Sequence, residues 1–150
     1  MAQVLRRRGR IQLRLNAEER EALRGLVGML RPHTAKTPAA TPKAYEDDAA
    51  AQADYARWIH GDLAKSREAD LDYLDAGLGA GDNTLVLTES TAFTWLRALT
   101  HLRLAAADLL GVDGDDWEAT ATEETRDSTE YRTLVTLGWL QEELVAALET

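Results

Sequence analysis

The chain of 150 residues contains no cysteine. This absence excludes disulfides, cysteine nucleophiles, thiolate metal sites and thiol redox sensing. The sequence also lacks an uninterrupted apolar run of the roughly 20 residues that cross a membrane. Its arginine-rich start has no apolar segment of the kind found in secretory signals. We therefore expect a cytoplasmic protein without a membrane partner.

Proline is scarce, and all three prolines fall between residues 32 and 44. Together with the threonines and alanines around them, they predict a flexible loop over residues 32–44. The segment before this loop is too short to bury a core of its own, whereas the full length suits one domain. We predict a single domain over residues 1–150 with the loop inside it.

Charge is distributed unevenly along the chain. The net charge is −9, but residues 1–31 hold eight arginines against three glutamates, a net +5 that leaves −14 for the remainder. The densest basic run consists of Arg6, Arg7, Arg8 and Arg10. Such an arm is either solvated beside an acidic surface or binds an anionic partner, for which nucleic acid is one class.

Apolar periodicity predicts a mainly α fold. We predict four or five helices, at about 17–31, 47–78 (one kinked helix or two), 89–110 and 128–148. Asn16 and Glu19 have the spacing of a capping box, and Thr88 and Gly111 have the residue types that start and end a helix. The third of these helices is the most apolar, so we expect it to be central.

Two short segments have strand character. Residues 10–15 alternate between apolar and polar side chains, and residues 84–87 are β-prone. We predict that they pair in a two-stranded ribbon. Because such a ribbon is marginal alone, it must pack on the helices.

One arginine falls on the apolar side of the central helix. At about 100° per residue, Arg103 lies among the leucines of that helix. A buried guanidinium needs a carboxylate, and the candidates on neighbouring helices are Asp62, Glu130 and Glu142. We interpret Arg103 as half of a structural ion pair. The alternative is a small-anion binder or an enzyme centred on Arg103.

The last helix has two apolar stripes. One is the stripe expected to face the core, and the other consists of Val135, Trp139 and Ala146. A helix with two apolar faces is either deeply buried or shared between the core and an interface. This second stripe is our candidate surface for self-association.

Other polar clusters fall short of functional sites. His60, Asp62 and His101 lack a second ligand at helical spacing, and the glycines of 77–81 follow a helix rather than precede one. The acidic stretch 113–118 lacks the full calcium-loop signature. The sequence thus predicts no catalytic, cofactor-binding or metal-ligating residue and no cofactor.

Several soft motifs follow one another in a fixed order. They are the amino-terminal strand and helix, Ala44-Tyr45 before Asp62-Leu63, and the runs at 93–99 (FTWLRAL), 102–104 (LRL), 111–112 (GV) and 138–145 (GWLQEELV). Their order and spacing resemble DUF2017, a mainly actinobacterial family of uncharacterised proteins.

The resemblance implies a small intracellular protein, often encoded near a protease adaptor, with a regulatory role and no established reaction or cofactor. Where relatives tend to carry an Asn-Asp pair before Leu-Arg-Leu, this chain has Thr100-His101. Any polar contact made by that pair would be altered here.

Our leading hypothesis is a non-enzymatic interaction or regulatory protein that acts as a homodimer, with another protein as a further partner. The first alternative is a nucleic-acid-linked transcriptional regulator that uses the arginine arm. The second is the anion binder or enzyme centred on Arg103.

Overall fold

The computed structural model describes residues 2–35, 47–111 and 122–150. Its elements, in chain order, are β1 (Gln3–Arg7), β2 (Arg10–Arg14), α1 (Ala17–Thr34), α2 (Ala49–Gly79), β3 (Thr84–Leu87), α3 (Glu89–Leu110), α5 (Glu123–Arg126) and α6 (Thr129–Glu149). The mainly α prediction is confirmed, with five helices and three strands in the described ranges.

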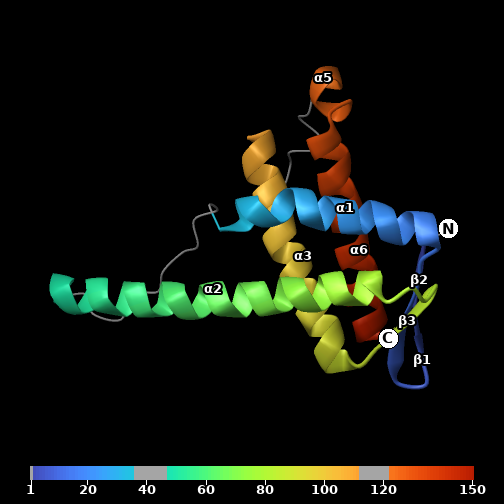
Figure 1. Cartoon of the computed structure of the whole chain (residues 1–150), viewed down its shortest axis with the longest axis horizontal. Coiled ribbons are helices and arrows are strands. Elements are labelled where there is room, and N and C mark those ends of the chain that lie inside the picture. Colours follow the sequence, from blue (N-terminus) through green and yellow to red (C-terminus); the bar gives the residue numbers. More distant parts are fainter. Residues whose placement is uncertain (1, 36–46, 112–121) are drawn as a thin grey trace.

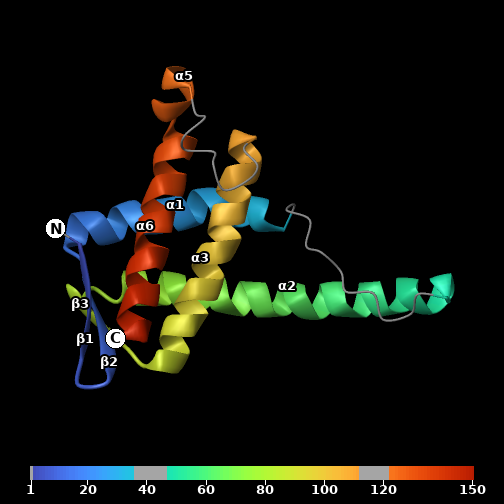
Figure 2. The same cartoon turned by 180° about the vertical axis from the view of Figure 1, so that it is seen from behind.

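The long helices form two crossed layers (Figure 1). Helices α1 and α2 run side by side in one layer, α3 and α6 form the other, and the sheet lies at one end of both (Figure 2). Helix α3 packs against α1, α2 and α6 and also touches the sheet. It is therefore the central helix, as its composition predicts.

The predicted helix ends are present. Asn16 Oδ1 accepts a hydrogen bond from the Glu19 N–H at 2.8 Å, and Glu19 Oε1 accepts one from the Asn16 N–H at 3.1 Å. Thr88 caps α3 with its side chain, and Gly111 ends that helix in the left-handed region at φ 73°. Local capping chemistry thus sets these boundaries without help from tertiary contacts.

The sheet is larger than predicted. Strands β2 and β3 pair antiparallel as expected, with Ile11 opposite Leu87 and Leu13 opposite Leu85. The predicted ribbon is present, but β1 adds a third strand by pairing along the other edge of β2. Residues 3–7 do not alternate in polarity, so their strand character arises from pairing rather than from their own pattern.

Helix α1 extends into the predicted loop. It runs through Pro32 to Thr34, so the first residues of the 32–44 segment are helical. A proline in the last turn removes a single backbone donor, and the helix ends two residues later, so the disruption is small. Residues 36–44 lie outside the described ranges.

The core is built around α3. Trp95, Leu99 and Leu102 are almost fully buried against leucines of the other helices and the sheet. Three apolar residues that the sequence places on this helix are instead exposed: Phe93 at 51%, Leu104 at 50% and Leu109 at 45%. Phe93 and Leu104 share one side of the helix at about 100° per residue, whereas Leu109 lies on another side, so the central helix keeps apolar side chains open to solvent on more than one side.

Helix α2 is a single helix whose two halves have different surroundings. Leu71, Leu74 and Leu78 in its carboxyl half are buried in the core. Residues 49–62, called the α2 arm below, project beyond the other elements (Figures 1 and 2). No described side chain of the α2 arm is buried.

Candidate functional site

Two adjoining grooves flank the outward side of α3. The α2–α3 groove, of about 560 Å³, is lined by Leu63, Ser66, Arg67, Asp70, Phe93, Leu96, Arg97, Thr100 and His101. The α3–α6 groove, of about 510 Å³, is lined by Leu96, Thr100, Arg103, Gln141, Glu142, Val145, Ala146 and Glu149. Leu96 and Thr100 belong to both grooves, so the two meet along α3.

Arg103 does not make the predicted ion pair within the described residues. It donates from Nη1 to Gln141 Oε1 at 2.6 Å, and its buried Nε has no hydrogen-bond partner in the described part of the chain. Asp62 lies on the exposed α2 arm, and Glu142 lines the groove without pairing. The Glu130 side chain lies outside the described residues.

Gln141 links α6 to α3 at the same place. Its Nε2 donates to Thr100 Oγ1 at 2.7 Å, and the Thr100 hydroxyl donates to the Leu96 carbonyl at 2.9 Å. Gly138 lies one turn earlier on α6, and a Cβ there would be 3.8 Å from the Arg103 guanidinium carbon. That distance is an ordinary van der Waals contact, so the guanidinium packs over this turn of α6 and is held by the Gln141 amide rather than by a described carboxylate.

Asp70 and Arg97 hold α2 and α3 together in the other groove. Asp70 is only 6% exposed, and Arg97 donates to it twice, from Nε at 3.1 Å and from Nη2 at 3.2 Å. These hydrogen bonds raise the pKa of Arg97 above its ordinary value. Sequence reasoning missed Asp70. The available signal was an aspartate directly before the buried Leu71 stripe.

Arg67 and His101 lie beside this ion pair. The buried Nε of Arg67 has no hydrogen-bond partner among the described residues, and the nearest carboxylate oxygen is Glu68 Oε1, at 3.8 Å. Burial lowers the pKa of His101, the charges of Arg67 and Arg97 lower it further, and Asp70 acts against them. The imidazole is therefore neutral near pH 7, and the residues that line the groove include two arginines, Arg67 and Arg97, against one acid, Asp70.

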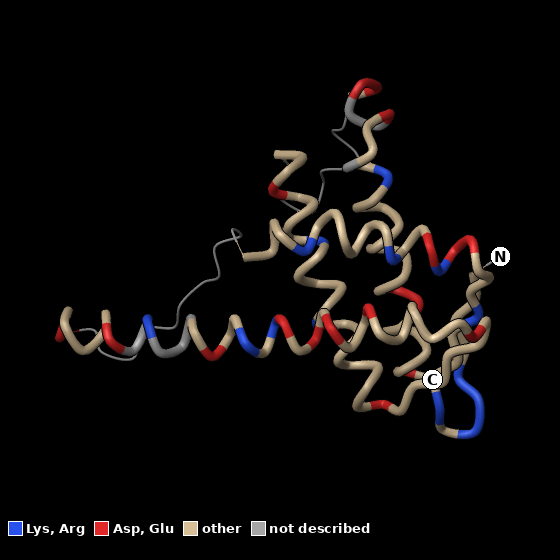
Figure 3. Tube along the Cα trace, viewed as in Figure 1, with Lys and Arg blue, Asp and Glu red and all other residues tan. Residues whose placement is uncertain are grey.

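The arginines of the predicted arm lie on the β1–β2 hairpin (Figure 3). Arg6 is anchored, because it donates to Glu89 Oε1 at 2.6 Å and to the Leu148 carbonyl at 3.2 Å. Arg7 and Arg10 face each other across the strands, and Arg8 begins the turn between them with φ 52°. Within the described ranges no carboxylate pairs with Arg7, Arg8 or Arg10.

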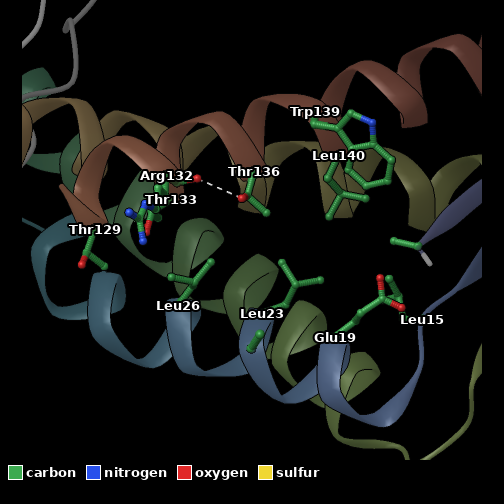
Figure 4. A pocket seen from close by; sticks show the side chains of 12 residues that line it. Leu15, Glu19, Leu23, Leu26, Thr129, Arg132, Thr133, Thr136, Trp139 and Leu140 are labelled. Carbon is green, nitrogen blue, oxygen red and sulfur yellow. Dashed lines mark hydrogen bonds between the residues drawn. The ribbon is translucent and has the colours of Figure 1, made fainter. Parts of the chain in front are cut away.

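The predicted self-association stripe is exposed but divided between two grooves. Val135 is 38% exposed and Trp139 is 39% exposed. Trp139 lines a third groove, of about 340 Å³, where Leu23 and Leu26 of α1 face α6 (Figure 4). Ala146 lines the α3–α6 groove instead. Trp139 and Ala146 therefore border two different grooves, and Val135 lines neither of them.

The remaining sequence candidates do not come together as a site. His101 lines the α2–α3 groove, Asp62 is exposed on the α2 arm, and nothing is described of the His60 side chain. In the described ranges, no three histidines or acids are placed to hold a metal ion. No helix of these ranges combines the length and apolarity of a membrane crossing. The acidic stretch 113–118 lies outside the described residues.

Comparison with known proteins identifies a family and nothing further. The model of the family described as "Domain of unknown function (DUF2017)" matches residues 1–148 of the chain. No curated protein and no solved structure matches. The family resemblance read from the motifs is confirmed over almost the whole chain.

Proposed function

We propose that this chain, which belongs to the DUF2017 family of unknown function, is a non-enzymatic interaction or regulatory protein that acts as a homodimer. The observation that carries the proposal is the outward side of α3. Leu63, Phe93 and Leu104 are each between 41% and 51% exposed there. Grouped large apolar side chains in solvent are typical of interaction surfaces.

The polar groups beside these side chains support the same conclusion. Arg67 and Arg103 each carry a buried Nε without a hydrogen-bond partner in the described part of the chain. Leaving a buried donor unsatisfied costs about 1–3 kcal/mol. Both arginines line the grooves, so a partner that covers the grooves can pair its carboxylates with their guanidinium groups. A second copy is the partner we propose, because the chain is acidic overall.

Sedimentation velocity over a range of concentrations tests the homodimer. We expect the wild type and the control Val86→Asp, which is altered at a 57% exposed position on β3, to sediment as dimers. Phe93→Asp places a charge in the proposed interface and shifts the protein to monomers. A wild type that is monomeric at every concentration would end the proposal. If only Trp139→Asp dissociated the dimer, the interface would instead be the predicted stripe of Val135, Trp139 and Ala146.

Nucleic-acid binding by the β1–β2 hairpin is a second candidate. The observation in favour of this candidate is that the hairpin contains a repulsive charge pair and an unfavourable backbone angle. Arg7 lies directly opposite Arg10, and Arg8 adopts a positive φ that favours glycine or asparagine. Residues 2–17 contain no acid to offset these charges.

Fluorescence anisotropy with a labelled DNA duplex tests this candidate. Binding should weaken steeply as salt rises, with a log–log slope of about −3 if three phosphates are neutralised. Arg8→Gln combined with Arg10→Gln should lower the affinity strongly. The control, Lys65→Gln combined with Arg132→Gln, removes the same charge from exposed positions elsewhere and should have little effect. Equal losses in both variants would indicate nonspecific charge attraction.

A small-anion binder centred on Arg103 is a third candidate. The observation in its favour is that Arg103 lies in an open groove instead of being sealed against a described carboxylate. Phosphate and a dicarboxylate should then raise the melting temperature of the wild type but not that of Arg103→Gln. Equal shifts in both proteins would count against a site at this residue.

A further inference from the structure

We propose that the α2–α3 groove of each copy is filled by the α2 arm of the other, with the two α2 helices antiparallel. This inference rests on the proposed homodimer and names the segment that forms it. It assigns an occupant to the groove and a role to the projecting half of α2.

The α2 arm needs a surface to pack on. Its 14 residues extend beyond the rest of the fold, and none of its described side chains is buried. Helices of this length are marginal in water unless a face is packed. Gly61 lowers the intrinsic helix propensity further, with no atom within 4 Å of the position its Cβ would take. The sequence also places three large apolar residues, Tyr55, Trp58 and Ile59, in this segment.

The groove offers what an amphipathic acidic helix needs. Phe93 is 51% exposed and Leu63 is 41% exposed at its apolar wall. Arg67 lines the same groove as the Asp70–Arg97 ion pair, and its buried Nε has no hydrogen-bond partner among the described residues. The groove is therefore apolar with one excess positive charge.

The charge of the arm is opposite to that of the groove. Residues 47–62 contain four aspartates (Asp47, Asp48, Asp54 and Asp62) against one arginine, Arg57. Arg57 hydrogen-bonds to Asp54 on the same helix, and Asp48 accepts from the Ala51 N–H as the cap of α2, so Asp47 and Asp62 have no such bond in the described part of the chain. The net negative charge of the incoming arm would attract the Arg67 guanidinium, which lines the groove.

The symmetry of this arrangement follows from the position of the two parts. Arm and groove are consecutive stretches of one helix, residues 49–62 and residues 63–70. When two such helices run antiparallel, each arm lies over the groove of the other copy, and the contact closes as a twofold dimer. The axis then passes near the junction of the two stretches, around residue 62. A side chain at the axis faces its own counterpart.

Single-cysteine crosslinking tests the arrangement, since the chain has no native cysteine to interfere. We expect Asp62→Cys and Leu63→Cys to form disulfide-linked dimers under mild oxidation, because residues at the axis come within the reach of a disulfide. The controls Val86→Cys and Ala146→Cys, at exposed sites away from the α2–α3 groove, should remain monomeric on denaturing gels. Circular dichroism of each variant checks that the fold is kept.

Sedimentation separates the two levels of the proposal. Phe93→Asp should weaken the dimer roughly tenfold or more, as the loss of one buried aromatic contact predicts. A dimer that crosslinks at Ala146→Cys but not at residues 62 and 63 would overturn the arm arrangement while leaving self-association in place. A protein that is monomeric throughout would overturn both. Crosslinks at residues 62 and 63 together with dissociation by Phe93→Asp support both.

Discussion

The carboxyl half of α2 and the α2 arm belong to one continuous helix but are stabilised in different ways. In the carboxyl half, Leu71, Leu74 and Leu78 are buried and Asp70 is paired with α3. In the arm, every described side chain is at least partly exposed, and the ion pair between Arg57 and Asp54 is local to the helix. The first half is held by its own fold, whereas no described side chain of the second half is buried.

Truncation of a large side chain should give the largest contrast between the halves. Leu74 is 1% exposed, so Leu74→Ala should lower the free energy of unfolding by about 2–5 kcal/mol through lost burial and a cavity. Leu63→Ala, at a 41% exposed position beside the arm, should change it by less than about 0.5 kcal/mol in the monomer. Urea unfolding at low protein concentration measures both. Similar losses would contradict the difference in packing.

Glycine substitutions should act with opposite signs in the two halves. A Cβ at Gly77 would lie 2.9 Å from Trp95 Cζ2, and the indole is fully buried, so Gly77→Ala should destabilise the protein by about 1–3 kcal/mol. At Gly61 the space is open, so Gly61→Ala should stabilise the helix by roughly 0.5–1 kcal/mol. Thermal unfolding of both variants checks the signs. Stabilisation by Gly77→Ala would show that Trp95 can move aside.

Loss of a charge should matter more in the packed half. Asp70→Asn breaks the two hydrogen bonds from Arg97, but Arg97 is 55% exposed and remains solvated, so we expect a loss of about 1 kcal/mol. Asp54→Asn removes an exposed pair within one helix and should cost roughly 0.3 kcal/mol. Denaturant midpoints resolve this difference. Equal effects would mean that the Asp70 pair is no better than a surface pair.

The smallest effect concerns pH and His101. Because its pKa is lowered in the fold, by burial and by Arg67 and Arg97 against Asp70, the folded state binds the proton less well than the unfolded state. Stability is therefore complete above the ordinary histidine pKa of about 6.5 and decreases as the pH falls below it. Comparing wild type and His101→Gln by urea unfolding at about pH 7.5 and pH 5.5 isolates this contribution. A steeper decrease in the variant would contradict the direction.

The identity of residue 101 also explains part of the groove's charge. The family resemblance implies an acidic residue at this position, which lines the α2–α3 groove together with Arg67 and Arg97. Here His101 supplies no negative charge, and the Nε of Arg67 has no partner in the described part of the chain. His101→Asp should therefore satisfy Arg67 and stabilise the monomer while weakening any partner that binds through this arginine.

Much of the secondary structure follows from short-range signals. The capping box at Asn16, the Thr88 cap and the left-handed Gly111 depend on residues within one turn of each other, and each occurs where predicted. The first strand does not follow from such signals, since the polarity of Gln3–Arg7 does not alternate. It is a strand because the hairpin places it beside β2. The signal that could have revealed it is Arg8-Gly9, whose positive φ angles form a tight hairpin turn.

The candidate site was less accessible to sequence reasoning. The helical wheel placed Arg103 on the apolar side and correctly implied that it needs a partner, but the partner is the amide of Gln141, 38 residues away on α6. Arg67 gave no signal, because an arginine on a long charged helix is an ordinary surface residue, and the signal for Asp70 was its place directly before the buried Leu71 stripe. Only their position opposite Arg97 and His101 makes them a site.

The sequence by itself determined the helical content, the helix ends, the central helix and the family, because these depend on local chemistry and on periodicity along one chain. The tertiary structure decided which apolar side chains stay exposed, which arginines lack acceptors and where α2 leaves the core. Those properties depend on which parts of a helix are covered by neighbouring elements, because a side chain is buried only where another element packs on it. The helical pattern of α2 continues through both halves, but its packing within one copy ends near Leu63.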